Sequence, residues 1–279
     1  MKGIDMRLRT FLAATLALLA AAAAGAGAAW AETVRFDSGS ALAEHDATLT
    51  AEFDLPAGEG PFPAVVLLHG CAGLSDTVEA GLRAHAAFLE AHGFATLIVD
   101  SFGPRGLGDG RVCSDLNALA QARWYRVADA FAARAWLAAR PEIDGRAIFL
   151  IGQSNGGSVA VLAAKPRALR DHPGAEPFAG VVAYYPWCGV IGNDLDFASP
   201  LLLLLGGADD WVPSSACAEK AARADDDRLS AIVYQGAHHS FDLAVPVQSY
   251  AGHTVGGDFA ATEASRTAYL AFFEGISRR

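Results

Sequence analysis

The chain has 279 residues, of which 52% are hydrophobic and 19% charged, and its formal net charge at pH 7 is −10. This length and apolar content suffice for a large buried core within one domain. The negative charge makes nucleic acids and anionic membrane surfaces poor partners. No internal repeat or linker interrupts the sequence after residue 31, so residues 32–279 are predicted to form a single domain.

Residues 1–31 have the composition of a secretory signal peptide. Basic residues precede an apolar run from Phe11 to Ala29, and residues 29–31 offer a small-x-small cleavage site. A retained anchor fits less well, because the run is rich in alanine and only marginally long enough to span a bilayer. We therefore predict cleavage after Ala31, a periplasmic or secreted location, and no membrane anchoring of the mature chain.

Short apolar runs bounded by glycine and proline alternate with segments of helical periodicity along the rest of the chain. Strands are predicted at 33–37, 48–54, 64–68, 94–99, 148–153, 178–184, 200–205 and 231–234, and helices at 78–92, 116–140, 159–164, 214–223 and 260–274. This alternation predicts an α/β fold with a mostly parallel central sheet flanked by helices on both faces. Ligands of such sheets bind at the carboxyl ends of the strands.

The helix predicted at 116–140 has an apolar stripe, with three arginines largely outside it. Apolar side chains at helical spacing form a stripe that is expected to pack on the sheet, namely Trp124, Val127, Phe131 and Ala135. Arg123, Arg126 and Arg134 fall largely outside this stripe.

The strand at 148–153 leads into Ser154 through the sequence Gly-Gln-Ser-Asn-Gly. Gly152 and Gly156 leave room where a strand turns sharply into a helix, and a serine in such a turn sits on strained backbone above the sheet edge. Ser154 is therefore the candidate nucleophile. The backbone N–H of Asn155, at the start of the following helix, is a candidate oxyanion donor.

The loop after the strand at 64–68 has the sequence His69-Gly70-Cys71-Ala72-Gly73, and its backbone can face the same space as Asn155. We assign the second oxyanion donor to the backbone N–H of Cys71. Because His69 precedes the serine in the sequence, we interpret it as a packing residue of the turn and not as a catalytic residue.

Two adjacent acids, Asp209 and Asp210, follow the strand at 200–205. An acid at the carboxyl end of a strand, downstream of the serine, can orient a catalytic histidine. We favour Asp209, which is nearer to the strand. Asp210 is expected to face solvent or to cap the helix that begins near Ser214.

The loop after the strand at 231–234 contains two adjacent histidines, His238 and His239, either of which can supply the base. The order serine, aspartate, histidine along the chain is the order of the α/β-hydrolases.

Five segments resemble the dienelactone hydrolase family of α/β-hydrolases. They are His69-Gly70-Cys71-Ala72-Gly73-Leu74, Asp100-Ser101-Phe102-Gly103-Pro104-Arg105-Gly106, Gly152-Gln153-Ser154-Asn155-Gly156-Gly157, Asp209-Asp210-Trp211-Val212-Pro213 and His239-Ser240-Phe241. The resemblance extends from about Glu52 to the C-terminus. In that family the acid precedes a Val-Pro pair, as Asp209 does here, and the histidine is followed by Ser-Phe, which implies His239.

Dienelactone hydrolases themselves use a cysteine nucleophile with the help of a glutamate, whereas this chain has Ser154 and no glutamate in the strand at 64–68. Serine-type relatives resemble general carboxylic ester hydrolases. The resemblance therefore implies a carboxylesterase-like enzyme with a triad of Ser154, Asp209 and His239, which acts on a small ester or lactone without a cofactor or metal. A true lactone or dienelactone hydrolase, a peptidase, an acyltransferase and a non-catalytic binding protein are the alternatives, because the fold alone does not fix the reaction.

Residues for a substrate pocket are harder to assign. Tyr184, Tyr185, Trp187 and Trp211 follow strand ends and are candidates for an aromatic wall, and Arg105 is a candidate partner for a substrate carboxylate. Packing explains the aromatic side chains equally well, and an arginine in a Pro-Gly loop often binds backbone carbonyls. The sequence makes no prediction of the oligomeric state.

The chain contains four cysteines, an even number that favours two disulfides in an exported protein, and their spacing fits no zinc motif. In the fold that the resemblance implies, the strands before Cys71 and Cys113 are neighbours, and so are the strands before Cys188 and Cys217. Any other pairing would have to reach across the strand of the nucleophile. We therefore predict the pairs Cys71–Cys113 and Cys188–Cys217.

Overall fold

The structure, a computed structural model, describes residues 32–40, 43–108, 110–224 and 228–278. The main sheet has the spatial strand order β1-β2-β4-β3-β5-β6-β7-β8. Its strands are β1 (Glu32–Asp37), β2 (Thr48–Asp54), β3 (Phe62–Leu68), β4 (Ala95–Asp100), β5 (Ile143–Gln153), β6 (Val181–Tyr184), β7 (Leu201–Gly206) and β8 (Leu229–Tyr234). All neighbouring pairs from β4 to β8 are parallel, whereas β2 is antiparallel to β1 and β4. The mostly parallel sheet predicted from the sequence is confirmed, while the predicted signal peptide, residues 1–31, lies outside the described residues.

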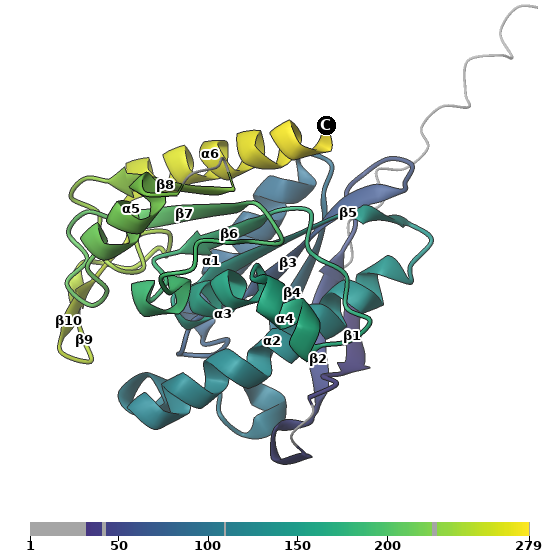
Figure 1. Cartoon of the computed structure of the whole chain (residues 1–279), viewed down its shortest axis with the longest axis horizontal. Helices are drawn as coiled ribbons and strands as arrows, with labels where there is room; N and C mark the ends of the chain where they lie inside the picture. The colour runs from purple at the N-terminus through teal and green to yellow at the C-terminus, as the bar shows by residue number, and fades with distance from the viewer. Residues whose placement is uncertain (1–31, 41–42, 109, 225–227, 279) are drawn as a thin grey trace, which may run out of the picture.

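Helices cover both faces of the sheet (Figure 1). They are α1 (Asp76–Glu90), α2 (Leu116–Ala138), α3 (Asn155–Ala163), α4 (Pro166–Asp171), α5 (Ser215–Ala222) and α6 (Phe259–Ser277). Side chains alternate between the faces of a strand, so β3 supplies Val66 and Leu68 to the core under α2, α3 and α5, and Val65 and Leu67 to the core under α1 and α6. Among the described residues, no helix is long and apolar enough to cross a membrane.

The predicted stripe of α2 is partly wrong. Phe131 is buried as expected, but Trp124 is 59% exposed and the side chain of Arg126 is fully buried. The reason is that α2 also packs on the start of α3 and on the loop after β3, where Arg126 donates to Asn155 Oδ1 (2.7 Å) and to the His69 carbonyl (2.8 Å). These two acceptors bind the terminal nitrogens of the buried guanidinium, while its Nε has no partner.

The sequence pattern predicted neither the short helix α4 nor the hairpin of β9 (Gln248–Tyr250) and β10 (His253–Val255). All three residues of β9 are exposed, so no alternation of buried and exposed side chains marks the strand. The hairpin lies between the loop that follows β8 and helix α6, and its β10 strand bridges to His239 through Val255.

Candidate active site

The predicted strand-to-helix turn carries Ser154 between β5 and α3. Ser154 has φ 52° and ψ −112°, a backbone conformation that is strained for any residue with a side chain. Gly156 allows the start of α3 to pack against the loop after β3, because a Cβ there would lie 2.5 Å from the His69 carbonyl and 2.6 Å from the Leu68 carbonyl. The first turn of α3 is thereby held beside the end of β3.

Substitution of Gly156 by alanine is therefore expected to destabilise the protein, by about 3 kcal/mol, because backbone carbonyls cannot move aside to admit the methyl group. Gly275→Ala is the matched control. Gly275 is also helical, in α6, and a Cβ at this position would have no neighbouring atom within 4 Å, so alanine should stabilise the protein by up to about 1 kcal/mol. Urea unfolding midpoints compare the two variants, and equal midpoints would contradict the steric argument.

A chain of hydrogen bonds connects three of the predicted site residues. Ser154 Oγ lies 3.0 Å from His239 Nε2, and His239 Nδ1 lies 2.8 Å from Asp209 Oδ2. The other oxygen of Asp209 accepts the backbone N–H groups of Trp211 (2.9 Å) and Val212 (2.8 Å). These bonds fix the carboxylate, which in turn orients the imidazole toward the serine.

The neighbouring histidine and acid have other partners. His238 Nδ1 lies 3.1 Å from the carbonyl of Ala208. Asp210 accepts from the backbone N–H and the hydroxyl of Thr254, each at 2.9 Å, and thereby ties the β9/β10 hairpin to the acid loop. Of the two expectations for Asp210, that it faces solvent is confirmed, since its side chain is 52% exposed, and that it caps α5 is not, since Ser214 is the N-cap of that helix.

His69 lies in the turn after β3 and is fully buried. Burial, together with the charge of Arg126, holds its pKa well below the usual value, although a bond to the Gly70 carbonyl opposes this shift. The neutral ring donates from Nδ1 to that carbonyl (2.7 Å) and accepts the backbone N–H of Ser101 at Nε2 (3.2 Å). These contacts support the interpretation of His69 as a packing residue. Burial also lowers the pKa of Arg126, to about 10.

A second buried acid, which the sequence did not single out, lies behind the site. Asp242 accepts hydrogen bonds from His85 (3.0 Å), Gln153 (2.5 Å) and the hydroxyl of Tyr185. Burial acts to raise the pKa of Asp242, but these hydrogen bonds and the charge of His85 outweigh it and lower the pKa. Gln153 precedes the nucleophile, and the Tyr185 ring lies 4.5 Å from the ring of His239. The network thus includes the residue before the nucleophile and a ring that lies beside His239.

A pocket of about 420 Å³ opens in front of Ser154. Its described lining comprises Gly70, Cys71, Ala72, Ser75, Thr77, Val78, Gly108, Gly110, Cys113, Gln153, Ser154, Tyr185, Trp211, His239, Ser240, Leu243, Val245, Gln248, Tyr250 and Val255. Cys71 therefore borders the same space as the serine, and Asn155 is the first residue of α3, where backbone N–H groups have no partners within the helix.

Of the predicted pocket residues, Trp211 and Tyr185 line this pocket and three others do not. Tyr184 is fully buried on the side of the sheet covered by α6. Trp187 is 49% exposed, and the guanidinium of Arg123 lies 4.4 Å from its ring. Arg105 pairs with Asp129 at 2.8 Å and also donates to backbone carbonyls. The pocket assignment of these three residues is corrected accordingly.

Both predicted disulfides are present. The Cα atoms are 5.0 Å apart in Cys71–Cys113 and 5.1 Å apart in Cys188–Cys217. The first disulfide joins the loops that follow the neighbouring strands β3 and β4, and both of its cysteines line the pocket. The second joins the loop after β6 to α5, which follows the acid loop.

Reduction is expected to lower activity before it unfolds the protein, because Cys71–Cys113 fixes the turn beside Ser154. Replacing both of these cysteines by serine should lower kcat/KM on the order of 10-fold, as expected for a small displacement of an aligned group. The pair Cys188→Ser and Cys217→Ser, outside the pocket, is the matched control for general loss of a cross-link. Circular dichroism and activity are followed together, and a loss of activity only alongside unfolding would contradict this expectation.

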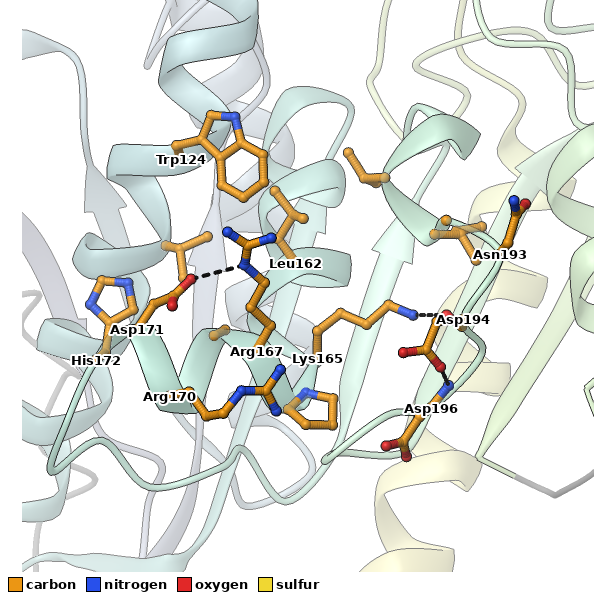
Figure 2. A pocket seen from close by; sticks show the side chains of 16 residues that line it. Trp124, Leu162, Lys165, Arg167, Arg170, Asp171, His172, Asn193, Asp194 and Asp196 are labelled. Atoms are coloured by element: carbon orange, nitrogen blue, oxygen red, sulfur yellow. Dashed lines mark hydrogen bonds and ion pairs between the residues drawn. The ribbon is translucent and has the colours of Figure 1, made fainter.

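A second hollow, of about 360 Å³, lies between α2, α4 and the loop before β7 (Figure 2). Some of its charged side chains are paired, since Arg167 bonds to Asp171 at 3.2 Å and Lys165 donates to the carbonyl of Asp194. Trp124 forms one of its walls. The hollow and the pocket at Ser154 have no lining residue in common.

A mostly parallel sheet with a serine on a strained turn, and with an acid and a histidine following in that order, defines an α/β-hydrolase. The model of the dienelactone hydrolase family matches residues 49–277. The chain therefore belongs to the dienelactone hydrolase family. This membership supports a hydrolase activity for the protein.

The chain is also similar to individual proteins. The chain is 29% identical over 199 residues to an uncharacterized protein of Mycobacterium tuberculosis, and the match spans 66% of each chain. It is similar in structure to a dienelactone hydrolase-like promiscuous phosphotriesterase from metagenomic libraries, with a TM-score of 0.64, 24% identity and 90% and 99% of the two chains covered. A thermophilic esterase of Thermogutta terrifontis, solved with propionate bound, gives a TM-score of 0.61, 18% identity and 88% and 94% coverage.

Proposed function

We propose that this protein is a serine hydrolase that cleaves carboxylic esters through an acyl-enzyme. The observation that carries the proposal is the hydrogen-bonded chain from Ser154 through His239 to Asp209, with the serine on a strained turn at the edge of a pocket. A serine hydroxyl is a weak nucleophile unless a base removes its proton, and His239 is within reach to do so.

In the proposed mechanism, His239 Nε2 takes the proton of Ser154 Oγ while that oxygen attacks the ester carbonyl. The tetrahedral intermediate then breaks its bond to the alcohol, which leaves with the proton from His239. Water attacks the acyl-enzyme and gives its proton to His239, and the acid is released as the proton returns to Ser154. Asp209 accepts the Nδ1–H bond throughout and stabilises the imidazolium.

The backbone N–H groups of Cys71 and Asn155 are the proposed donors to the oxyanion. Their support is positional, since Cys71 borders the pocket and Asn155 begins α3 directly after the nucleophile. Arg126 contributes by holding the His69 carbonyl and the Asn155 side chain in place. This chemistry requires neither a cofactor nor a metal ion.

The proposed location is the periplasm or the extracellular medium, after cleavage at Ala31. Two disulfides are compatible with an oxidising compartment, where such bonds persist.

Short-chain p-nitrophenyl esters are expected to be hydrolysed, and the Thermogutta terrifontis structures with propionate and butyrate bound make these acyl groups the first to test. Release of p-nitrophenol by the wild type is compared with release by Ser154→Ala, which removes the nucleophile and leaves the pocket intact. A wild type no faster than Ser154→Ala would refute ester hydrolysis by this serine.

A further inference from the structure

The described residues that line the pocket at Ser154 present an uncharged surface to a substrate. Among the described residues that line it, the ionisable His239 is the sole exception. The walls are formed by large apolar and aromatic side chains, including Val78, Leu243, Val245, Trp211 and Tyr250. Tyr185 also contributes a neutral group, because burial and the nearby Asp242 raise the pKa of its phenol well above the usual value.

The arginine that the sequence offered as a partner for a substrate carboxylate is engaged elsewhere. Arg105 donates to both oxygens of Asp129 (2.9 and 2.8 Å) and to the carbonyls of His45 and Ser101. Its side chain is 6% exposed, so it is not available to a ligand in the pocket.

Two buried acids lie behind the lining. Asp209 bonds to His239, and Asp242 bonds to Tyr185 and to His85, so each carboxylate is one side chain removed from the pocket. A substrate carboxylate would lose its hydration in this apolar space, and the described residues that line the pocket include no lysine or arginine to pair with it. The net charge of −10 adds a repulsive long-range field.

The β9/β10 hairpin supplies the outer wall through Gln248, Tyr250 and Val255. It is held from both sides of the site, because Thr254 binds Asp210 of the acid loop and the backbone N–H of Gly256 donates to the His239 carbonyl (3.1 Å). The neutral wall is thus a fixed part of the site, and the exposed Gln248 is the position where a charge can be introduced without burying it in the core.

We propose that the pocket selects esters of uncharged acyl groups and discriminates against acyl groups that end in a carboxylate, with Gln248 as a position that determines this selectivity. The proposal rests on the proposed ester hydrolysis at Ser154. It names the substrate class that the lining of the same site accepts.

The test compares p-nitrophenyl hexanoate with mono-p-nitrophenyl adipate, in which a carboxylate replaces the terminal methyl group. The p-nitrophenyl methyl ester of adipic acid controls for the added length, and Ser154→Ala supplies the background rate. The wild type should have a kcat/KM about 100-fold higher for the hexanoate than for the adipate monoester, with the uncharged methyl ester close to the hexanoate.

Two variants with side chains of similar length then test the role of position 248 in this selectivity. Gln248→Lys should raise the ratio of adipate to hexanoate kcat/KM about 10-fold, because an ammonium group now faces the carboxylate, whereas Gln248→Met should not raise it. Because each variant is judged by a ratio of two substrates, a partial loss of folded protein cancels.

The proposal is overturned if the wild type cleaves both esters with similar kcat/KM, if it cleaves p-nitrophenyl acetate but not the hexanoate, or if Gln248→Lys and Gln248→Met have the same effect. Absence of turnover of every ester, including the acetate, is a different result, because it refutes the proposed function itself and the selectivity with it.

Discussion

Replacement of His239 by alanine is expected to lower the kcat for ester hydrolysis by roughly 10⁵- to 10⁶-fold, whereas His238→Ala should change it by less than about 10-fold. The two histidines are adjacent, but only the His239 ring lies between the serine hydroxyl and an aspartate, at 3.0 and 2.8 Å. The His238 ring lies 3.1 Å from the Ala208 carbonyl, a contact that can affect the loop but not the proton of Ser154.

The measurement is kcat and KM for p-nitrophenyl butyrate with both variants, accompanied by their unfolding midpoints. Loss of the base should reduce kcat with little change in KM, since the imidazole acts in the transition state and not in ground-state binding. Similar losses in the two variants, with both proteins folded, would show that the assignment of the base to His239 is wrong.

Motifs whose backbone geometry is local were predicted well from the sequence. Ser154 with Gly152 and Gly156 specifies a sharp turn through the space that the glycines leave, and the described structure has that turn. The parallel sheet followed from the alternation of strands and helices, and the disulfide pairs followed from the strand order of the fold that the resemblance implies.

Contacts between distant side chains were not predictable in the same way. Gln153 and Asp242 are 89 residues apart, and Arg126 and Asn155 are 29 apart, so no periodic pattern shows that these charged and polar groups are buried together. The burial of each depends on the partner, since an unpaired charge would not be tolerated there.

The aromatic wall of the pocket shows a third limit of prediction from the sequence. Tyr184 ends β6 and faces α6, while the next residue, Tyr185, has φ 35° and faces the site. Both rings belong to the same core cluster, and Tyr185 reaches the pocket because it lies just past the end of the strand, where its positive φ turns the chain. The sequence identified the loop but could not resolve this orientation.

The second large effect on kcat is expected at Asp209, which is also adjacent to a residue that could be mistaken for it, Asp210. Asp209→Asn should lower kcat by about 10⁴-fold, because an asparagine can present its NH₂ group to His239 and favour the tautomer that cannot accept the serine proton. Asp210→Asn is the matched control, with the same chemical change one residue away. Its amide can still accept the Thr254 N–H and donate to the Thr254 hydroxyl, so kcat should remain within about 3-fold of the wild type.

The division of the loss between kcat and KM separates a role of Asp209 in the chemistry from a merely structural one. Asp209→Asn should lower kcat with little change in KM, because the imidazolium that the Asp209 carboxylate stabilises forms only as the reaction proceeds. Asp210→Asn should leave both constants nearly unchanged, because the Asp210 carboxylate binds Thr254 and lies 3.8 Å from His253, whereas His239 is bound by Asp209. If Asp210→Asn were the variant with the large loss of kcat, the acid of the proposed triad would have to be reassigned to Asp210.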